Sequence, residues 1–179
     1  MGSIINVKQP EFNLRSRLNE LDYDRIPYEK MPPGTVIQHV YNVNNGSGHL
    51  TTTSGSWADL SFSVSITPHF SNSLMVIEWC ATGQQPNTAV GGSAVTIYRN
   101  NTTNLGSTQH SAMGLGVVAE FGSSAAKYVT ASNSFILYDE PGDRNPVSYH
   151  IWGKTTSSGT AYIAHSGVTR TLSVKEIRR

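Results

Sequence analysis

Residues 57–67 alternate regularly between apolar and polar side chains. Leu60, Phe62, Val64 and Ile66 stand at every second position, and serines fill the positions between them. Because successive side chains of a strand point to opposite faces, this period of two predicts a half-buried strand. Further β-rich runs cover residues 35–43, 74–81, 93–100, 128–138, 147–152, 160–165 and 171–177. The run at 74–81 is mostly apolar, so we expect it to be central in its sheet.

Short segments rich in Gly, Pro and Asn separate these runs. Residues 44–48 read Asn-Asn-Gly-Ser-Gly, and Asn-Gly is a strong signal for a hairpin turn. Eight or nine short strands joined by such loops indicate an all-β, jelly-roll-like antiparallel β-sandwich. We expect no helix after residue 31.

The first 31 residues follow a different pattern and carry ten of the chain's 25 charged side chains. Leu14, Leu18 and Leu21 share one helix face and predict a short helix over residues 11–21. Pro32-Pro33-Gly34 then forms a stiff break. We therefore predict two parts, an N-terminal anchoring arm (residues 1–31) and a β-sandwich domain (residues 32–179).

The arm has the composition of a binding segment. Three turns of helix are marginal alone in water, so the leucine face must lie against another surface. Arginines beside this face would set the register on an acidic partner more than the affinity. The predicted partner-binding residues are Ile4, Ile5, Leu14, Arg15, Arg17, Leu18, Leu21, Tyr23, Arg25, Ile26 and Tyr28.

Composition narrows the classes of partner. Only 14% of the residues are charged and the formal net charge is +1, so we expect binding neither to nucleic acid nor to membranes. Cys80 is the single cysteine, which rules out an intramolecular disulfide and a cysteine zinc cluster. We expect assembly in a reducing compartment, with the Cys80 side chain packed in the core.

Three groups of residues were weighed as sites. His39 and His150 would form a metal pair only if the fold brought them together. Asp139, Glu140 and Asp143 surround Pro141-Gly142, and they fit either a glycosidase acid pair or, more simply, a turn. A set of aromatic residues fits either a carbohydrate platform or core and subunit contacts. That set is Trp57, Trp79, Tyr98, Tyr149 and Trp152. We expect no catalytic residue, no metal and no cofactor, and thus not an enzyme.

Short motifs in a fixed order run through residues 33–177. They include Pro33-Gly34-Thr35-Val36-Ile37-Gln38, Val64-Ser65-Ile66-Thr67-Pro68, Ser73-Leu74-Met75-Val76-Ile77, Ile97-Tyr98-Arg99, Asp139-Glu140-Pro141-Gly142, Tyr149-His150-Ile151 and Leu172-Ser173-Val174-Lys175-Glu176-Ile177. In these motifs the body resembles a β-domain of small virion proteins of tailed phages, especially those that infect cyanobacteria. The resemblance implies a homotrimeric jelly-roll-like domain, as in capsid decoration proteins and short tail fibers, and it implies no catalysis.

The arm favours one of these relatives. A fiber needs a long shaft, whereas here the arm meets the body after only three residues. We therefore expect a trimeric cement protein that binds the major capsid protein through its arm, lies on the capsid exterior and is assembled in the host cytoplasm. The alternative is a short tail fiber or baseplate-attached protein that recognises host surface glycans and contacts tail or baseplate proteins. A third hypothesis is a glycan-degrading enzyme that uses Asp139 or Asp143.

Overall fold

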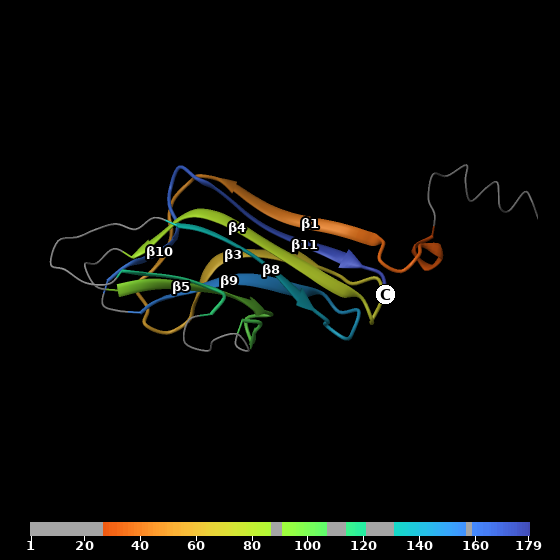
Figure 1. Ribbon diagram of the computed structural model, residues 1–179. Coiled ribbons are helices and arrows are strands. Elements are labelled where there is room, and N and C mark those ends of the chain that lie inside the picture. The colour runs from red at the N-terminus through yellow and green to blue at the C-terminus, as the bar shows by residue number, and fades with distance from the viewer. Residues whose placement is uncertain (1–26, 87–90, 107–113, 121–130, 157–158) are drawn as a thin grey trace, which may run out of the picture. The chain divides into compact units, whose positions relative to one another are not determined.

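The computed structural model describes residues 27–86, 91–106, 114–120, 131–156 and 159–179 (Figure 1). The chain divides into two units, Met1–Pro32 and Pro33–Arg179. In the described part of the first unit, Tyr28–Lys30 forms a single 3-10 turn, η1, in which the Lys30 N–H donates to the Pro27 carbonyl at 2.8 Å. The helix predicted over residues 11–21 lies outside the described residues.

The second unit is built from two antiparallel sheets (Figure 1). The first sheet contains β1 (Val36–Asn45), β2 (Leu50–Thr52), β4 (Leu74–Pro86), β8 (Ala131–Asp139), β10 (Ala161–Ala164) and β11 (Thr169–Ile177). The second contains β3 (Ala58–Ile66), β5 (Gly91–Arg99), β6 (Thr103–Asn104), β7 (Gly116–Glu120) and β9 (Val147–Thr155). The predicted all-β sandwich is confirmed. The alternating run at 57–67 is β3, and the apolar run at 74–81 lies in β4 between β11 and β8, as expected.

The strand order is that of a jelly roll. β10 and β11 lie one after the other along the same side of β4. On their far side, β1 pairs with β11 and β2 pairs with β10. In the second sheet, β6 and β7 share one side of β5. Each such pair therefore fills one strand position. The first sheet then reads β1/β2, β10/β11, β4, β8, and the second reads β3, β9, β5, β6/β7. The chain crosses between the sheets at nearly every step, which is why the two sheets share one core.

The connection between β1 and β2 corrects one prediction. Residues 44–48 do not close a hairpin, because β1 and β2 do not pair with each other and instead run end to end beside β11 and β10. Asn44 accepts hydrogen bonds from the N–H groups of Gly46 and Ser47, both at 3.0 Å. Gly46 has φ +95°, and the Gly167 N–H donates to its carbonyl at 2.9 Å. The Asn-Gly pair thus makes a local turn at a close backbone crossing rather than a reversal of the chain.

The core lies between the inner faces of the two sheets. Its largest fully buried side chains include Trp79 and Met75 from the first sheet and Tyr149 and Ile151 from the second. The Phe62 ring meets the Trp79 ring edge-on across the sandwich, with 5.7 Å between centroids. Strict alternation along β9, where every second residue is buried, shows how the period of two produces this layer.

Two polar contacts close the sandwich where β1 passes β3. The Asn42 side-chain amide donates to the Ser63 carbonyl at 2.9 Å, and the Gln38 amide donates to the Thr67 carbonyl at 2.6 Å. Both carbonyls belong to β3 or to the residue just after it, and β3 is an end strand of its sheet. Amide side chains therefore join the two sheets along this edge.

A buried carboxylate holds the loop after β3. Glu176 is fully buried and accepts hydrogen bonds from Ser73 Oγ at 2.5 Å, Gln38 Nε2 at 2.7 Å and the His69 backbone N–H at 2.7 Å. The His69 ring and the Phe70 N–H also contact it, at 3.0 Å and 3.3 Å. Burial alone would raise the pKa of Glu176, but these hydrogen bonds outweigh it and lower the pKa.

Candidate interaction face

The exposed apolar side chains are concentrated on one sheet. In the described part of Pro33–Arg179, every exposed large hydrophobic residue lies on β1 or β8, the two outer strands of the first sheet. These residues are Val36, Tyr41, Val43, Ile136 and Tyr138. Tyr41 and Tyr138 are the most exposed, at 66% and 68%. Because all of these exposed residues lie on two strands of one sheet, we assign the outer face of this sheet as the candidate interaction site.

The strand register arranges the outer face in rows that cross all four strand positions. One row contains Tyr41, Ser173, Glu78 and Ile136, and the next contains Val43, Thr171, Cys80 and Ser134. A third contains His39, Lys175, Val76 and Tyr138. Aromatic and aliphatic side chains thus flank a mainly polar strip on β11 and β4.

The two charged side chains of the polar strip, Glu78 and Lys175, form an ion pair with each other. Lys175 Nζ lies 2.8 and 2.9 Å from the two oxygens of Glu78, and Ser173 Oγ donates to the same carboxylate at 3.1 Å. The hydrogen bond from Lys175 lowers the pKa of Glu78. The carboxylate is ionised and paired at neutral pH, so the strip presents dipoles rather than a free charge to a partner.

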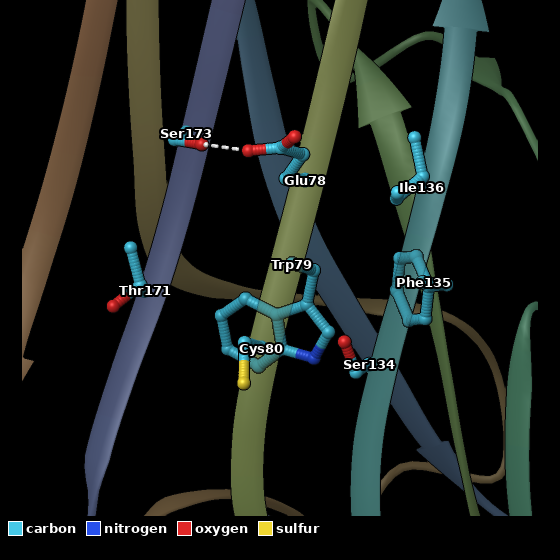
Figure 2. A pocket seen from close by; sticks show the side chains of 8 residues that line it. All are labelled: Glu78, Trp79, Cys80, Ser134, Phe135, Ile136, Thr171 and Ser173. Carbon is cyan, nitrogen blue, oxygen red and sulfur yellow. Dashed lines mark hydrogen bonds between the residues drawn. The ribbon is translucent and has the colours of Figure 1, made fainter.

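A shallow hollow of about 260 Å³ opens in this strip. It is lined by Glu78, Trp79, Cys80, Ser134, Phe135, Ile136, Thr171 and Ser173 (Figure 2). Thr171, Cys80 and Ser134 form one row of this lining, and the longer side chains of Glu78 and Ile136 stand in the next row (Figure 2). The prediction that Cys80 packs in the core is wrong: Cys80 is exposed on the outer face, and its neighbour Trp79 is buried instead. The alternation along β4 sets this choice, because adjacent residues point to opposite faces.

The three carboxylates near Pro141-Gly142 each have a separate partner. Asp139 pairs with Arg99 at 2.9 Å and accepts a hydrogen bond from the buried Tyr149 hydroxyl at 2.8 Å. Burial raises the pKa of Tyr149, and the charge on Asp139 raises it further. Glu140 pairs with Arg179, and Asp143 accepts from the Asn145 N–H at 2.8 Å. The arrangement matches the predicted turn at Asp143 and makes Asp139 a buried structural anchor rather than half of an acid pair.

The histidines do not assemble as proposed. His39 lies on the first sheet, whereas His150 lies on the second and contacts Asp59 at 3.2 Å. Another pair does meet: the rings of His49 and His165 stand edge to face, 4.3 Å apart, and His49 accepts from the Ser166 N–H. The sequence carries no local signal for this pair, because 116 positions separate His49 from His165. Among the described residues, no three His, Cys, Asp or Glu side chains are grouped to hold a metal ion.

The aromatic set divides between core and surface. Trp79 and Tyr149 are core residues. Trp152 and Tyr98, by contrast, are half-buried on the second sheet, and their rings stack at 4.1 Å. The Trp152 indole N–H also donates to Asn101 at 3.1 Å. Trp57 lies under the Lys154 ammonium at 4.7 Å. These surface rings already have intramolecular partners.

The predicted arm residues remain almost entirely untested. Tyr28 alone is described, in η1, with 39% of its surface exposed. The others, Ile4, Ile5, Leu14, Arg15, Arg17, Leu18, Leu21, Tyr23, Arg25 and Ile26, lie outside the described residues. None of the helices in the described part is long and apolar enough to cross a membrane.

No family model matches the chain, and no curated protein matches it. Among solved structures, it is similar to a chain of the tripod from the baseplate of bacteriophage Tuc2009, with 12% identity over 100% of both chains and a TM-score of 0.35. It is also similar to a chain of the infectious bursal disease virus particle, with 14% identity, a TM-score of 0.33 and coverage of 85% of this chain and 43% of that one. A mutant VP2 protein of the same virus gives 13% identity, a TM-score of 0.32 and coverage of 86% and 44%. These neighbours are viral proteins, but likeness at this level carries no argument about the present chain.

Proposed function

We propose that this chain is a structural protein of a tailed-phage virion. In this proposal it forms a homotrimeric cement protein on the capsid exterior, and residues 1–31 bind the major capsid protein. The observation that carries the proposal is the outer face of one sheet of the jelly roll, which has exposed apolar side chains along both of its edges. Such a face supports assembly with other protein surfaces. The ordered motifs that resemble small phage virion proteins support the same assignment.

The energetics favour several arms acting together. Each arm residue that becomes ordered on binding costs roughly 1–2 kcal/mol. Each fully buried apolar side chain returns roughly 1.5–3 kcal/mol. The ordering cost opposes the gain from burial, so a single arm binds weakly. Three arms on one body raise the effective concentration of the second and third contacts, so a trimer binds more tightly than a monomer.

Full-length protein with Leu14→Asp and Leu18→Asp tests the arm. We expect this variant to keep its fold and oligomeric state but to lose binding to undecorated capsids, measured by co-sedimentation and by particle occupancy in cryo-electron microscopy. The matched control is Ser16→Asp with Asn19→Asp, which adds the same charge to the opposite side of the predicted helix. Full occupancy by the leucine variant would refute the anchoring role.

A second function has one observation in its favour. The rings of Trp152 and Tyr98 stack on the second sheet, and the cross-strand neighbours of these two residues include Asp59 and His150. This supports a short tail fiber or baseplate-attached protein that recognises host glycans. Location of the protein on the tail, with glycan-array binding abolished by Trp152→Ala, would favour this function over capsid decoration.

A further inference from the structure

Two apolar patches lie at opposite edges of the outer face of the first sheet. The β1 patch is Tyr41 and Val43, and the β8 patch is Ile136 and Tyr138. β11 and β4 lie between them, so three strand spacings of about 4.8 Å place the patches roughly 14 Å apart. Each patch is therefore a separate contact surface.

Residues 135–138 of β8 are apolar on both faces of the strand, and β1 carries apolar residues among polar ones. In β8, Phe135 and Leu137 pack against the core, while Ile136 and Tyr138 point away from it. In β1, Val40 packs against the core, while Tyr41 and Val43 are exposed. An antiparallel sheet with one solvated face normally alternates apolar with polar residues, and strands buried on both faces are apolar throughout. Residues 135–138 of β8 therefore have the pattern of a strand with a cover on each side, whereas the inner face of β1 also carries Gln38 and Asn42.

We propose that the β1 patch of one copy of this chain binds the β8 patch of the next copy, and that three such contacts close a ring. This inference rests on the proposed homotrimer and names its interface. The occupant is a second copy because the face carries little free charge: Glu78 and Lys175 neutralise each other within the chain. A strongly charged partner would gain nothing from this face, whereas another copy offers an equally uncharged apolar patch.

The size of the patches favours a closed assembly over an open pair of copies joined by one contact. A single patch-to-patch contact brings together four large side chains, well short of the roughly 800 Å² per partner of a standard interface. In a closed ring every copy uses both patches, so the apolar area that each copy buries is doubled. A contact between two different patches is heterologous, and heterologous contacts produce rings when the rotation closes.

The ring also keeps the polar strip in contact with water, whereas a face-to-face dimer would bury it. A dimer built on the same face would press two Glu78–Lys175 pairs together and remove them from water, which costs several kcal/mol for each ion. In the ring, contact is limited to the two edges of each face. The strip and its hollow can then remain hydrated around the common axis.

Light scattering coupled to size-exclusion chromatography tests the interface on the full-length chain. We expect wild-type protein to have the mass of three protomers, and Tyr41→Glu and Tyr138→Glu each to give monomers. Mixed in equal amounts, the two variants retain one intact β8 patch and one intact β1 patch. Because such a pair has a single contact and no way to close a ring, we expect the mixture to contain nothing larger than a dimer.

Ser65→Glu is the matched control, because it adds the same charge at an exposed position of β3 on the other sheet. It should leave the trimer intact. Circular dichroism checks the fold of each variant, and Tyr41→Ser and Tyr138→Ser replace any glutamate variant that does not fold. Trimers that persist in both patch variants would overturn the interface while leaving the proposed function standing. Wild-type protein that stays monomeric at all concentrations would overturn the interface and the trimer together, whereas capsid binding by the arm is measured separately.

Discussion

The buried carboxylate of Glu176 allows the sharpest prediction about stability. It accepts three hydrogen bonds of 2.7 Å or less, from Ser73, Gln38 and the His69 backbone. Glu176→Gln keeps one acceptor oxygen but turns an amide N–H₂ toward groups that are themselves donors. Hydrogen bonds to a charged group contribute about 1.5–3 kcal/mol each, and their losses are not additive. We expect the substitution to lower the free energy of unfolding by about 3 kcal/mol.

The measurement is urea unfolding at a fixed protomer concentration, followed by tryptophan fluorescence, to which the buried Trp79 contributes. A loss of about 3 kcal/mol in a chain of this size lowers the Tm by about 10 °C. Glu140→Gln is the matched control, because Glu140 is exposed and its ion pair with Arg179 lies at the surface. Exposed pairs contribute at most about 1 kcal/mol. A Glu176→Gln variant within 1 kcal/mol of wild type at pH 7 would refute the assigned role.

The pH dependence gives an independent check. The pKa of Glu176 is lower in the folded chain than the ordinary value of 4.5. Its contribution to stability is therefore complete above pH 4.5 and disappears as the pH falls through the folded-state pKa. We expect the stability difference between wild type and Glu176→Gln to be constant near neutrality and to narrow in acid below pH 4.5. A difference that widened in acid would contradict the direction of the shift.

Three further predictions concern other contacts. Asp139→Ala should lower the free energy of unfolding by about 3–5 kcal/mol. Because one hydrogen bond joins Asp139 to Tyr149, a double-mutant cycle with Tyr149→Phe should give a coupling energy of about 0.5–3 kcal/mol, and strictly additive losses would exclude that bond. Gly46→Ala should cost more than Gly48→Ala in thermal melts, because both have positive φ but only at Gly46 would a Cβ come within 2.9 Å of the Gly167 backbone; equal losses would argue against the close crossing. Cys80 should react with a maleimide in the folded protein, with one label per chain by mass spectrometry. A thiol that reacts only after denaturant is added would show that the Cys80 side chain is buried.

Much of the fold could be predicted from the sequence because strands with one buried face carry a local signal. β3 and β9 alternate so clearly that their positions follow from the period of two. β2 and β6 have three and two residues, which is too short for any period to appear. The Asn-Gly pair predicts a hairpin that β1 and β2 do not form, because local turn chemistry specifies a bend but not which strands pair after it.

The candidate site was only partly accessible from the sequence. The apolar run of residues 135–138 predicts apolar side chains on both faces of β8, whereas the position of Tyr41 opposite Ser173 depends on long-range register. The same limit applies to Glu176, since its partners lie more than 100 positions away along the chain. Cys80 illustrates a further limit. A nearly continuous apolar strand gives no indication of which alternate set faces the core.

The amide contacts from Asn42 and Gln38 to the carbonyls of β3 have a consequence at high concentration. An open strand edge is a template on which foreign chains polymerise, and amyloid begins at such edges. Because the Ser63 and Thr67 carbonyls already accept hydrogen bonds from these amides, an incoming strand would first have to displace the amide side chains. Substituting both amides with apolar residues should therefore lead to fibrils before it leads to unfolding.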